Sequence, residues 1–184
     1  RIKSYGLLGD ELLYTKAAQG FNGHPFHAYV FSEPYPVPNA LYARMLALPY
    51  GLVSSLRAFT GGHLMNAFVF ASTIVPVYAL SRCLGATRRW ALVGGAFAVV
   101  IPWTVAVLVL MSESLAYPTF AWAMLAAIVA IANPRPRNDV LFVVAMVVML
   151  YARTQFVIVV PAFAVGLGIP QIAWPGRAPG VLAG

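Results

Sequence analysis

The sequence predicts an all-α protein: a polytopic transmembrane helical bundle with an exoplasmic loop that carries short juxtamembrane helices. Two observations lead to this fold class. Of the 184 residues, 61% are hydrophobic and only 9% are charged, whereas soluble domains carry about 25% charged residues. The apolar residues also form runs, several of them near the ~20 residues that cross a bilayer as a helix. A soluble chain of this composition would expose large apolar patches and aggregate, so lipid is the solvent that suits it.

The chain divides into two parts by composition. Residues 1–38 are predicted to form the exoplasmic loop, and residues 39–184 the transmembrane region of about five or six apolar helices. Within the loop, Asp10–Gly20 is predicted to be a short amphipathic helix, because its apolar residues recur at helical spacing and a glycine ends it. Residues 21–39 follow with a run of spaced prolines, Pro34, Pro36 and Pro38, which hold the backbone extended and exclude a helix or central strand. The chain starts at Arg1 without a signal peptide and ends without a polar tail, so we expect both ends to be truncated.

The apolar runs are not equivalent. The first is interrupted by two arginines and by Pro49 and Gly51, so an interfacial or re-entrant helix is favoured over a crossing one. The fifth is short for a span, and the sixth contains two prolines and two glycines. In order, the runs are residues 40–59, 64–80, 90–111, 115–132, 140–151 and 156–174.

Basic residues predict the topology. The net charge of +7 comes from twelve Lys and Arg against five carboxylates. Arg82, Arg88 and Arg89 lie between the second and third runs, and Arg135 and Arg137 between the fourth and fifth. Cytoplasmic loops of membrane proteins are enriched in such residues, so both segments are predicted to be cytoplasmic. No basic-aromatic module accompanies them, so nucleic acid is not an expected partner.

The acidic residues fall on the other side in this topology. The turn at residues 111–114 is predicted to be exoplasmic, together with the start of the second run near residues 61–63. If the first run crosses the membrane, Asp10 and Glu113 lie on opposite faces. If it does not, they share the exoplasmic face, which is the favoured arrangement.

The cysteine and histidine residues of the sequence exclude a disulfide framework and a zinc site. Cys83 is the only cysteine and is interpreted as a small apolar filler. His24 and His27 are three residues apart, but Pro25 places them in a loop and no other ligand completes a zinc site. The sequence also lacks a phosphate-binding glycine loop, a nucleophile elbow and a dinucleotide fingerprint.

Three carboxylates are the candidates for chemistry. Asp10 and Glu11 open the predicted amphipathic helix, where helix capping competes with a role as general base or metal ligand. Glu113 stands between two apolar runs with almost no loop, a costly position unless the acid faces water, a partner or a ligand. Its alternative is a helix-start charge with Ser112 as N-cap. Pro118 is expected to bend the helix and open a cavity beside this acid.

Arg153 also interrupts apolar sequence, and by the same topology it faces the side of Glu113. A guanidinium there is suited to hold a phosphate through two hydrogen bonds. It is equally suited to be an interfacial anchor whose charge reaches the lipid headgroups. The sequence does not favour either interpretation.

Four segments together resemble the GT-C glycosyltransferases, polytopic enzymes that use polyprenyl-phosphate sugars and include the protein O-mannosyltransferases and the aminoarabinose transferases of lipid A. Residues 6–18, GLLGDELLYTKAA, resemble the acidic motif that opens a juxtamembrane helix in their first exoplasmic loop. Residues 34–42, PYPVPNALY, look like a degenerate form of the Pro/Tyr-rich segment that follows. Residues 75–82, VPVYALSR, and 112–118, SESLAYP, resemble a span that ends in a basic turn and the later acidic turn. The likeness covers most of residues 5–170 through order and spacing; the family's first transmembrane helix and C-terminal spans are absent, and the Pro-rich segment lacks a His-Pro-Pro form.

The resemblance implies transfer of a sugar, with inversion, from a polyprenyl-phosphate donor to an exoplasmic glycan, lipid or protein acceptor. Asp10 is then the base that deprotonates or hydrogen-bonds the acceptor hydroxyl. Glu11 and Glu113 orient the acceptor or the sugar, or hold a divalent cation where one takes part. Arg153, with Lys16 and Tyr14 as further substrate-binding candidates, neutralises the leaving phosphate. The implied location is the cell membrane, as a multi-pass protein with its active face exoplasmic.

Two other classes of function are open to the same sequence. A transporter would line a solute path with Glu113 and Arg153 and use interrupted helices such as the sixth run. A non-catalytic membrane scaffold would use its acidic residues only as caps and anchors. Against transport, the cleaner apolar runs carry no charge at mid-span.

Overall fold

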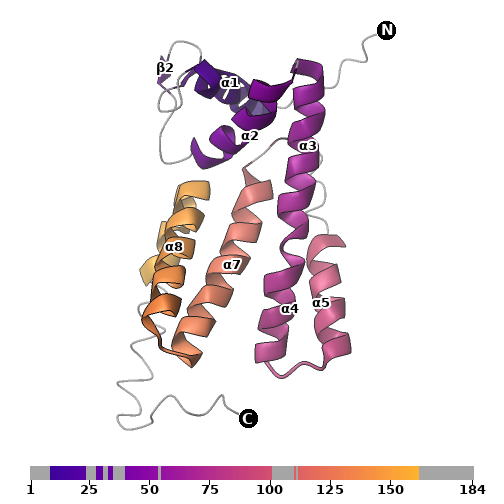
Figure 1. Cartoon of the computed structure of the whole chain (residues 1–184), viewed down its shortest axis with the longest axis vertical. Coiled ribbons are helices and arrows are strands. Elements are labelled where there is room, and N and C mark those ends of the chain that lie inside the picture. Colours follow the sequence, from indigo (N-terminus) through magenta and orange to yellow (C-terminus); the bar gives the residue numbers. More distant parts are fainter. Residues whose placement is uncertain are drawn as a thin grey trace.

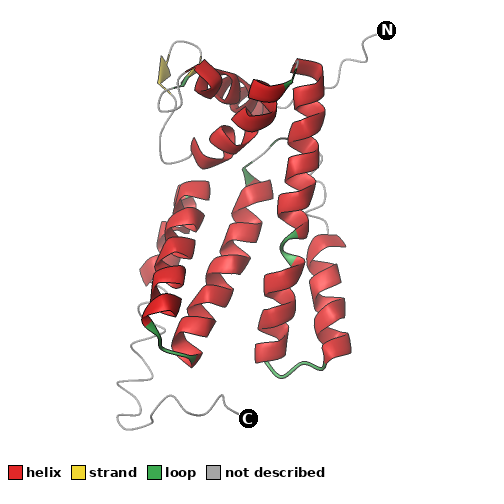
Figure 2. Cartoon of the chain, in the orientation of Figure 1, coloured by secondary structure: helices red, strands yellow, loops and turns green. Residues whose placement is uncertain are grey.

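The computed structural model describes residues 9–23, 28–30, 33–34, 40–53, 55–100, 110 and 112–161. These residues are mostly helical (Figure 2). The helices are α1 (Gly9–Gly23), α2 (Ala40–Leu52), α3 (Ser55–Ala71), α4 (Ile74–Cys83), α5 (Arg88–Val100), α7 (Glu113–Ala132), α8 (Pro136–Ala152) and the 3-10 helix η2 (Thr154–Ile158). Two short strands, β1 (Tyr29–Val30) and β2 (Glu33–Pro34), pair in antiparallel register.

The long helices run alongside one another, and the two N-terminal helices lie across one end of them (Figure 1). Helices α3 and α4 follow each other as one rod, α5 packs beside α4, and α7 packs against the rod and against α8. We call the end that carries α1, α2 and the start of α7 the acidic end. The opposite end, with the α4–α5 and α7–α8 turns, is the arginine end. The two arginine-rich segments therefore lie at the same end of the bundle.

Within the described residues, two stretches of helix are long and apolar enough to cross a membrane: Arg57–Cys83, with 27 residues, and Glu113–Ala132, with 20. The second matches the predicted fourth run almost residue for residue. The fifth run, expected at residues 140–151, is longer in the structure, because α8 begins at Pro136 and its first turn is polar. The third run is described only as far as Val100, and most of the sixth lies outside the described residues.

The first and second runs differ from the prediction. The run at residues 40–59 is not one helix: α2 ends at Leu52 and α3 begins at Ser55. Residues 61–63, expected near the exoplasmic start of the second run, lie in the middle of α3 instead. Here tertiary packing outweighs the turn preference of glycine, since a Cβ at Gly62 would stand 3.2 Å from both Leu46 and Leu110. Gly62 allows α2 and the segment before α7 to pack closely against α3.

The rod of α3 and α4 is interrupted at Ser72 and Thr73. Pro76 has no backbone N–H and so gives no hydrogen bond to the carbonyl of Ser72, four residues earlier. That carbonyl accepts the amide of Val75 at 3.2 Å instead, which tightens the turn. The Ser72 hydroxyl donates to the carbonyl of Val69 at 2.6 Å. The break therefore follows from the proline in the second run.

The α4–α5 turn at the arginine end is closed by the chain's own backbone. Gly85 has a φ of 85°, a left-handed conformation that glycine adopts without steric cost. Its amide bonds the carbonyl of Arg82 at 3.0 Å, and the amide of Ala86 bonds that of Ser81 at 3.0 Å. This is the Schellman arrangement that commonly ends helices. Beyond the turn, a Cβ on Gly95 would stand 3.1 Å from the backbone oxygen of Ile74, so a glycine allows α4 and α5 to approach closely.

The α7–α8 hairpin has a small core of its own, formed by Ala123, Met146 and Met149. The rings of Phe120 and Phe156 stack beside it with centroids 5.5 Å apart. The buried residue Asn138 stabilises the turn between the two helices, because its Nδ2 donates to the carbonyl of Asn133 at 2.7 Å. This packing brings the end of α8 next to the start of α7.

At the acidic end, α1 packs on α2 through two apolar clusters. One contains Ala17 and Phe21 of α1 with Ala43 of α2, and the guanidinium of Arg44 lies 5.2 Å from the ring centre of Phe21. The other joins α1 and α2 to the start of α7 and the end of α8; its buried members are Ala18, Tyr42, Leu46, Leu110, Leu115 and Ala152. The second cluster brings four helices together around the acidic residues.

Candidate active site

The first acidic motif lies in the first turn of α1. Asp10 is the second residue of that helix, so it is not the N-cap, and its side chain lies outside the described part of the chain. Glu11 is buried, with 6% of its surface exposed. Its Oε1 accepts the backbone N–H of Leu110 at 3.1 Å. Such a buried carboxylate needs hydrogen-bond partners, and Glu11 has one from a distant part of the chain.

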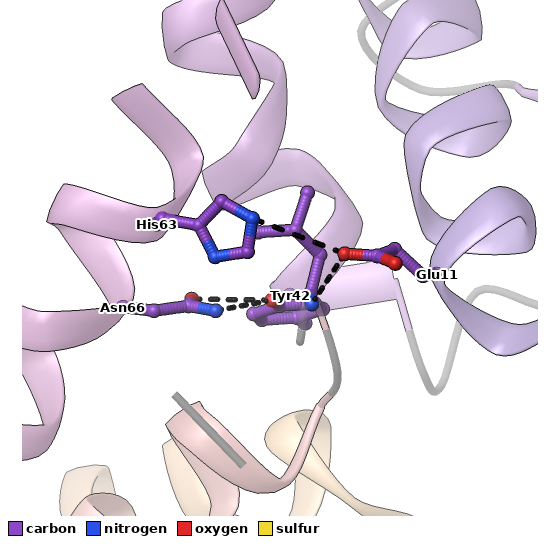
Figure 3. Close-up of polar contacts among 5 residues, drawn as sticks. Glu11, Tyr42, His63 and Asn66 are labelled. Carbon is purple, nitrogen blue, oxygen red and sulfur yellow. Dashed lines mark hydrogen bonds and ion pairs between the residues drawn. The ribbon is translucent and has the colours of Figure 1, made fainter. Parts of the chain in front are cut away.

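A layer of polar side chains continues from Glu11 across α2 and α3 (Figure 3). The Nε2 of His63 lies 3.9 Å from Glu11 Oε1. Below it, the hydroxyl of Tyr42 donates to Asn66 Oδ1 at 3.1 Å and accepts from Asn66 Nδ2 at 2.9 Å. Tyr42 and Asn66 are both fully buried. We call Glu11, Tyr42, His63 and Asn66 the polar layer.

The second acidic motif stands at the start of α7. Glu113 is half-buried, and the hydroxyl of Ser112 donates to its Oε2 at 3.4 Å. Ser112 precedes the helix but makes no side-chain capping bond to the backbone. Arg153, the first residue after α8, pairs through Nη1 with Glu113 Oε1 and donates through Nε to Gln155 Oε1 at 2.7 Å. The expectation that Arg153 faces the side of Glu113 is therefore confirmed, and the two residues form an ion pair.

A cavity of about 500 Å³ opens beside this ion pair. Glu113, Arg153 and Gln155 contribute its polar groups. Its remaining lining is apolar or aromatic and comes from α3, α7 and η2: Phe70, Ala116, Tyr117, Phe120 and Phe156. Phe70 stacks on Tyr117 with ring centroids 5.6 Å apart. The cavity predicted beside Glu113 is thus present, and it combines apolar walls with one carboxylate and one guanidinium.

The two acidic motifs lie at the same end of the bundle. Burial raises the pKa of Tyr42 above its ordinary value, and the charges of Glu11 and Glu113 act in the same direction. The backbone N–H of Leu110, three residues before Glu113, donates to Glu11 and so links the two motifs directly. The two motifs therefore share one end of the bundle.

Of the two remaining predicted site residues, Tyr14 lies next to the polar layer and Lys16 does not. The ring of Tyr14 meets that of Tyr42 edge-on with centroids 5.0 Å apart, so Tyr14 packs against the polar layer. Lys16 is exposed on α1. It lies five residues after Glu11, about 140° around the helix, and so faces away from the buried carboxylate.

Sequence reasoning missed three members of the polar layer: Tyr42, His63 and Asn66. Asn66 was a detectable signal, because an amide within an otherwise apolar run is expensive unless it is paired. His63 stands near the predicted start of the second run, where a polar side chain needs no buried partner. Tyr42 had no signal, because a tyrosine next to a proline-rich segment has no obvious partner.

Within the described residues, no three His, Cys, Asp or Glu side chains stand together in a way that could hold a metal ion. The predicted exclusion of zinc at His24 and His27 concerns a segment outside the described residues. Comparisons of the chain with protein-family models, with curated proteins and with solved structures found no match.

Proposed function

We propose that this chain belongs to a multi-pass membrane glycosyltransferase that moves a sugar from a polyprenyl-phosphate donor to an exoplasmic acceptor. One observation carries the proposal. Both acidic motifs and Arg153 gather at one end of the helical bundle, where Glu113 and Arg153 line a largely apolar cavity of about 500 Å³. Sugar transfer from a lipid carrier requires this combination, because the carrier brings an apolar chain and an anionic phosphate while the acceptor needs a carboxylate base.

The surface of the helices supports a lipid environment. Large apolar side chains are exposed on α5 and α8, and they include Trp90, Phe97, Val143, Val147 and Tyr151. In water such surfaces would drive aggregation, whereas a bilayer covers them. The arginine-rich turns share one end, which fits a cytoplasmic side for both and an exoplasmic side for the acidic end.

In the proposed reaction, the carboxylate of Asp10 takes the proton from the acceptor hydroxyl. The acceptor oxygen then forms the new bond to the anomeric carbon while the bond from that carbon to the phosphate oxygen breaks. The departing polyprenyl phosphate carries the negative charge, which the Arg153 guanidinium stabilises. Glu113 keeps Arg153 in place before the donor binds and orients the sugar afterwards. Lys16 and Tyr14 remain predicted contributors to substrate binding.

The test is transfer of radiolabelled sugar from a polyprenyl-phosphate donor by the full-length protein in proteoliposomes. Asp10→Asn should lower the rate by at least about 100-fold, since general-base catalysis contributes 10²–10⁴-fold. Asp139→Asn is the matched control: Asp139 is an exposed acid in the first turn of α8, at the arginine end, and its loss should leave the rate unchanged. Equal rates for Asp10→Asn and wild type would remove Asp10 as the base. Solute flux without a glycosyl product would replace the proposal with transport.

A further inference from the structure

Glu11 differs from the other acids because its carboxylate is buried and contacts groups from distant parts of the chain. Its carboxylate is buried, and one oxygen accepts the Leu110 amide at 3.1 Å and faces His63 Nε2 at 3.9 Å (Figure 3). An acid that exchanges protons with a substrate has to reach that substrate. With only 6% of its surface exposed, Glu11 has little room to do so.

The bond to Leu110 spans 99 positions of sequence. On one side it holds the first turn of α1, which also contains Asp10. On the other side it holds the residue two positions before Ser112 and three before Glu113. Both ends of the bond lie within three residues of a carboxylate of the proposed site. The contact therefore sets the distance between the two acidic motifs.

We infer that Glu11 is a positioning residue, and that His63 supports it: together with the Leu110 amide they fix the first acidic motif against the second. This inference rests on the proposed function and changes the role of one residue in it. The two adjacent acids then have different roles: Asp10 acts on the acceptor hydroxyl, and Glu11 holds the two acidic motifs in place. His63 enters from α3, so the contact joins three parts of the chain at one carboxylate oxygen.

A positioning role and a catalytic role respond differently to conservative substitution. Glu11→Gln keeps a carbonyl oxygen that accepts the Leu110 amide and loses only the charge. Glu11→Met has nearly the same volume and no acceptor, so the amide is left buried without its partner. A positioning residue should therefore tolerate Gln but not Met, whereas a proton-transferring or cation-binding residue should tolerate neither.

The first experiment measures sugar transfer by the full-length variants. We expect Glu11→Gln to stay within about threefold of wild type, and Glu11→Met to lose about tenfold or more, the scale expected for an unsatisfied buried amide. His63→Leu should fall between them. Equal loss in Gln and Met would overturn the inference in favour of a charge-dependent role. Full activity in both would overturn it as well, because the contact would then position nothing.

The second experiment needs no transferase activity. In a Cys83→Ser background, which removes the only cysteine, Ser112→Cys reports the packing of the second motif, because Ser112 is only 7% exposed. The rate of thiol labelling at position 112 should rise several-fold with Glu11→Met and stay unchanged with Glu11→Gln. Asp139→Met at the arginine end is the control and should also have no effect.

The two experiments separate the inference from the proposed function. Labelling that follows the Gln and Met pattern in a protein without transferase activity would keep the positioning role and reject the glycosyltransferase. Labelling that ignores position 11 would reject the positioning role whatever the activity. If Glu11→Met does not accumulate in membranes, Glu11→Ala with the same labelling assay replaces it, since Ala also lacks the acceptor.

Discussion

At the arginine end of the bundle, one turn is closed by backbone bonds and the other by a single buried asparagine, whereas at the acidic end several polar side chains are buried, paired or set against a cavity. The α4–α5 turn is closed by backbone bonds around Gly85, and its arginines are exposed. The acidic end buries Glu11, Tyr42 and Asn66 and pairs Glu113 with Arg153.

The difference concerns free energy. A turn made of backbone bonds and glycine places little polar surface in an apolar environment. Buried polar side chains cost desolvation energy and are retained where they fix a particular arrangement or take part in chemistry. The acidic end contains several such buried polar side chains. Substitutions there should therefore affect activity, whereas substitutions at the arginine end should affect stability alone.

The largest expected effect comes from reversing the Glu113–Arg153 pair. Glu113→Arg and Arg153→Glu should each lower sugar transfer by about 100-fold or more, because each removes a group that acts on the substrate charge. The double variant restores an ion pair and should recover the protein's thermal stability but not its transfer rate. Transfer assays and unfolding curves on the same preparations check this.

Full transfer activity in the double variant would mean that the pair is only structural, and the contrast between the ends would lose its main support. Asp139→Arg provides the control for adding a positive charge. It should alter neither the transfer rate nor the melting temperature appreciably, because exposed charges contribute little.

The next effect concerns the Tyr42–Asn66 pair. Asn66→Ala leaves the Tyr42 hydroxyl buried without its partner and should lower the free energy of unfolding by about 1–3 kcal/mol. Replacing both partners by apolar groups, Tyr42→Phe with Asn66→Leu, should cost less than the sum of the two single changes. Equilibrium unfolding in mixed micelles measures the wild type, Asn66→Ala, the singles Tyr42→Phe and Asn66→Leu, and the double variant. Additive single and double values would show that the pair has no coupling energy.

At the arginine end, Gly85→Ala should destabilise the protein by about 1–2 kcal/mol, the cost of a left-handed conformation for a residue with a Cβ. Nothing lies within 4 Å of the added methyl group, so the backbone is the only source of the cost. Sugar transfer per folded molecule should be unchanged. A loss of transfer at equal stability would mean that this end also serves the reaction.

The smallest effect is a pH dependence of stability. The pKa of Tyr42 is raised above its ordinary value of 10.0, first by burial. A raised pKa in the folded state means that the neutral form is favoured there, so the stability is fully present below pH 10.0 and falls as the pH rises above it. Tyr42→Phe should reduce the steepness of that fall in unfolding free energies measured between neutral and alkaline pH. An identical slope would place the alkaline sensitivity in other groups.

Much of the helical framework could be predicted from the sequence because apolar runs and helix breakers are local signals. The helix at Glu113–Ala132 follows from an uninterrupted apolar run between an acid and an Asn-Pro pair. The helix of the second run begins earlier than the predicted start near residues 61–63, because Gly62 lies inside α3, where Leu46 and Leu110 pack against it. Local sequence carries no information about that packing.

The candidate site was predictable in part for the same reason. Glu113 and Arg153 each interrupt apolar sequence, which marks both as candidates, and the positions of the basic turns predict that they lie on the same side. The contact between Glu11 and Leu110 was not predictable, because its donor is a backbone amide and every residue except proline has one. The contacts of His63 and Tyr42 could not be predicted either, because their partners are distant in the sequence.

The rod from Arg57 to Cys83 has 27 residues, a length of about 40 Å at 1.5 Å per residue. The hydrocarbon core of a bilayer is about 30 Å thick. If the rod crosses a bilayer in the proposed orientation, with Arg82 at the headgroups of one leaflet, roughly two turns of it, Arg57–His63, extend beyond the hydrocarbon on the opposite side. Asn66 then lies close to the boundary where water reaches the lipid. At that depth a histidine, an amide and a carboxylate are far less costly than at the middle of the bilayer, so the length of one helix sets where a polar layer can be built.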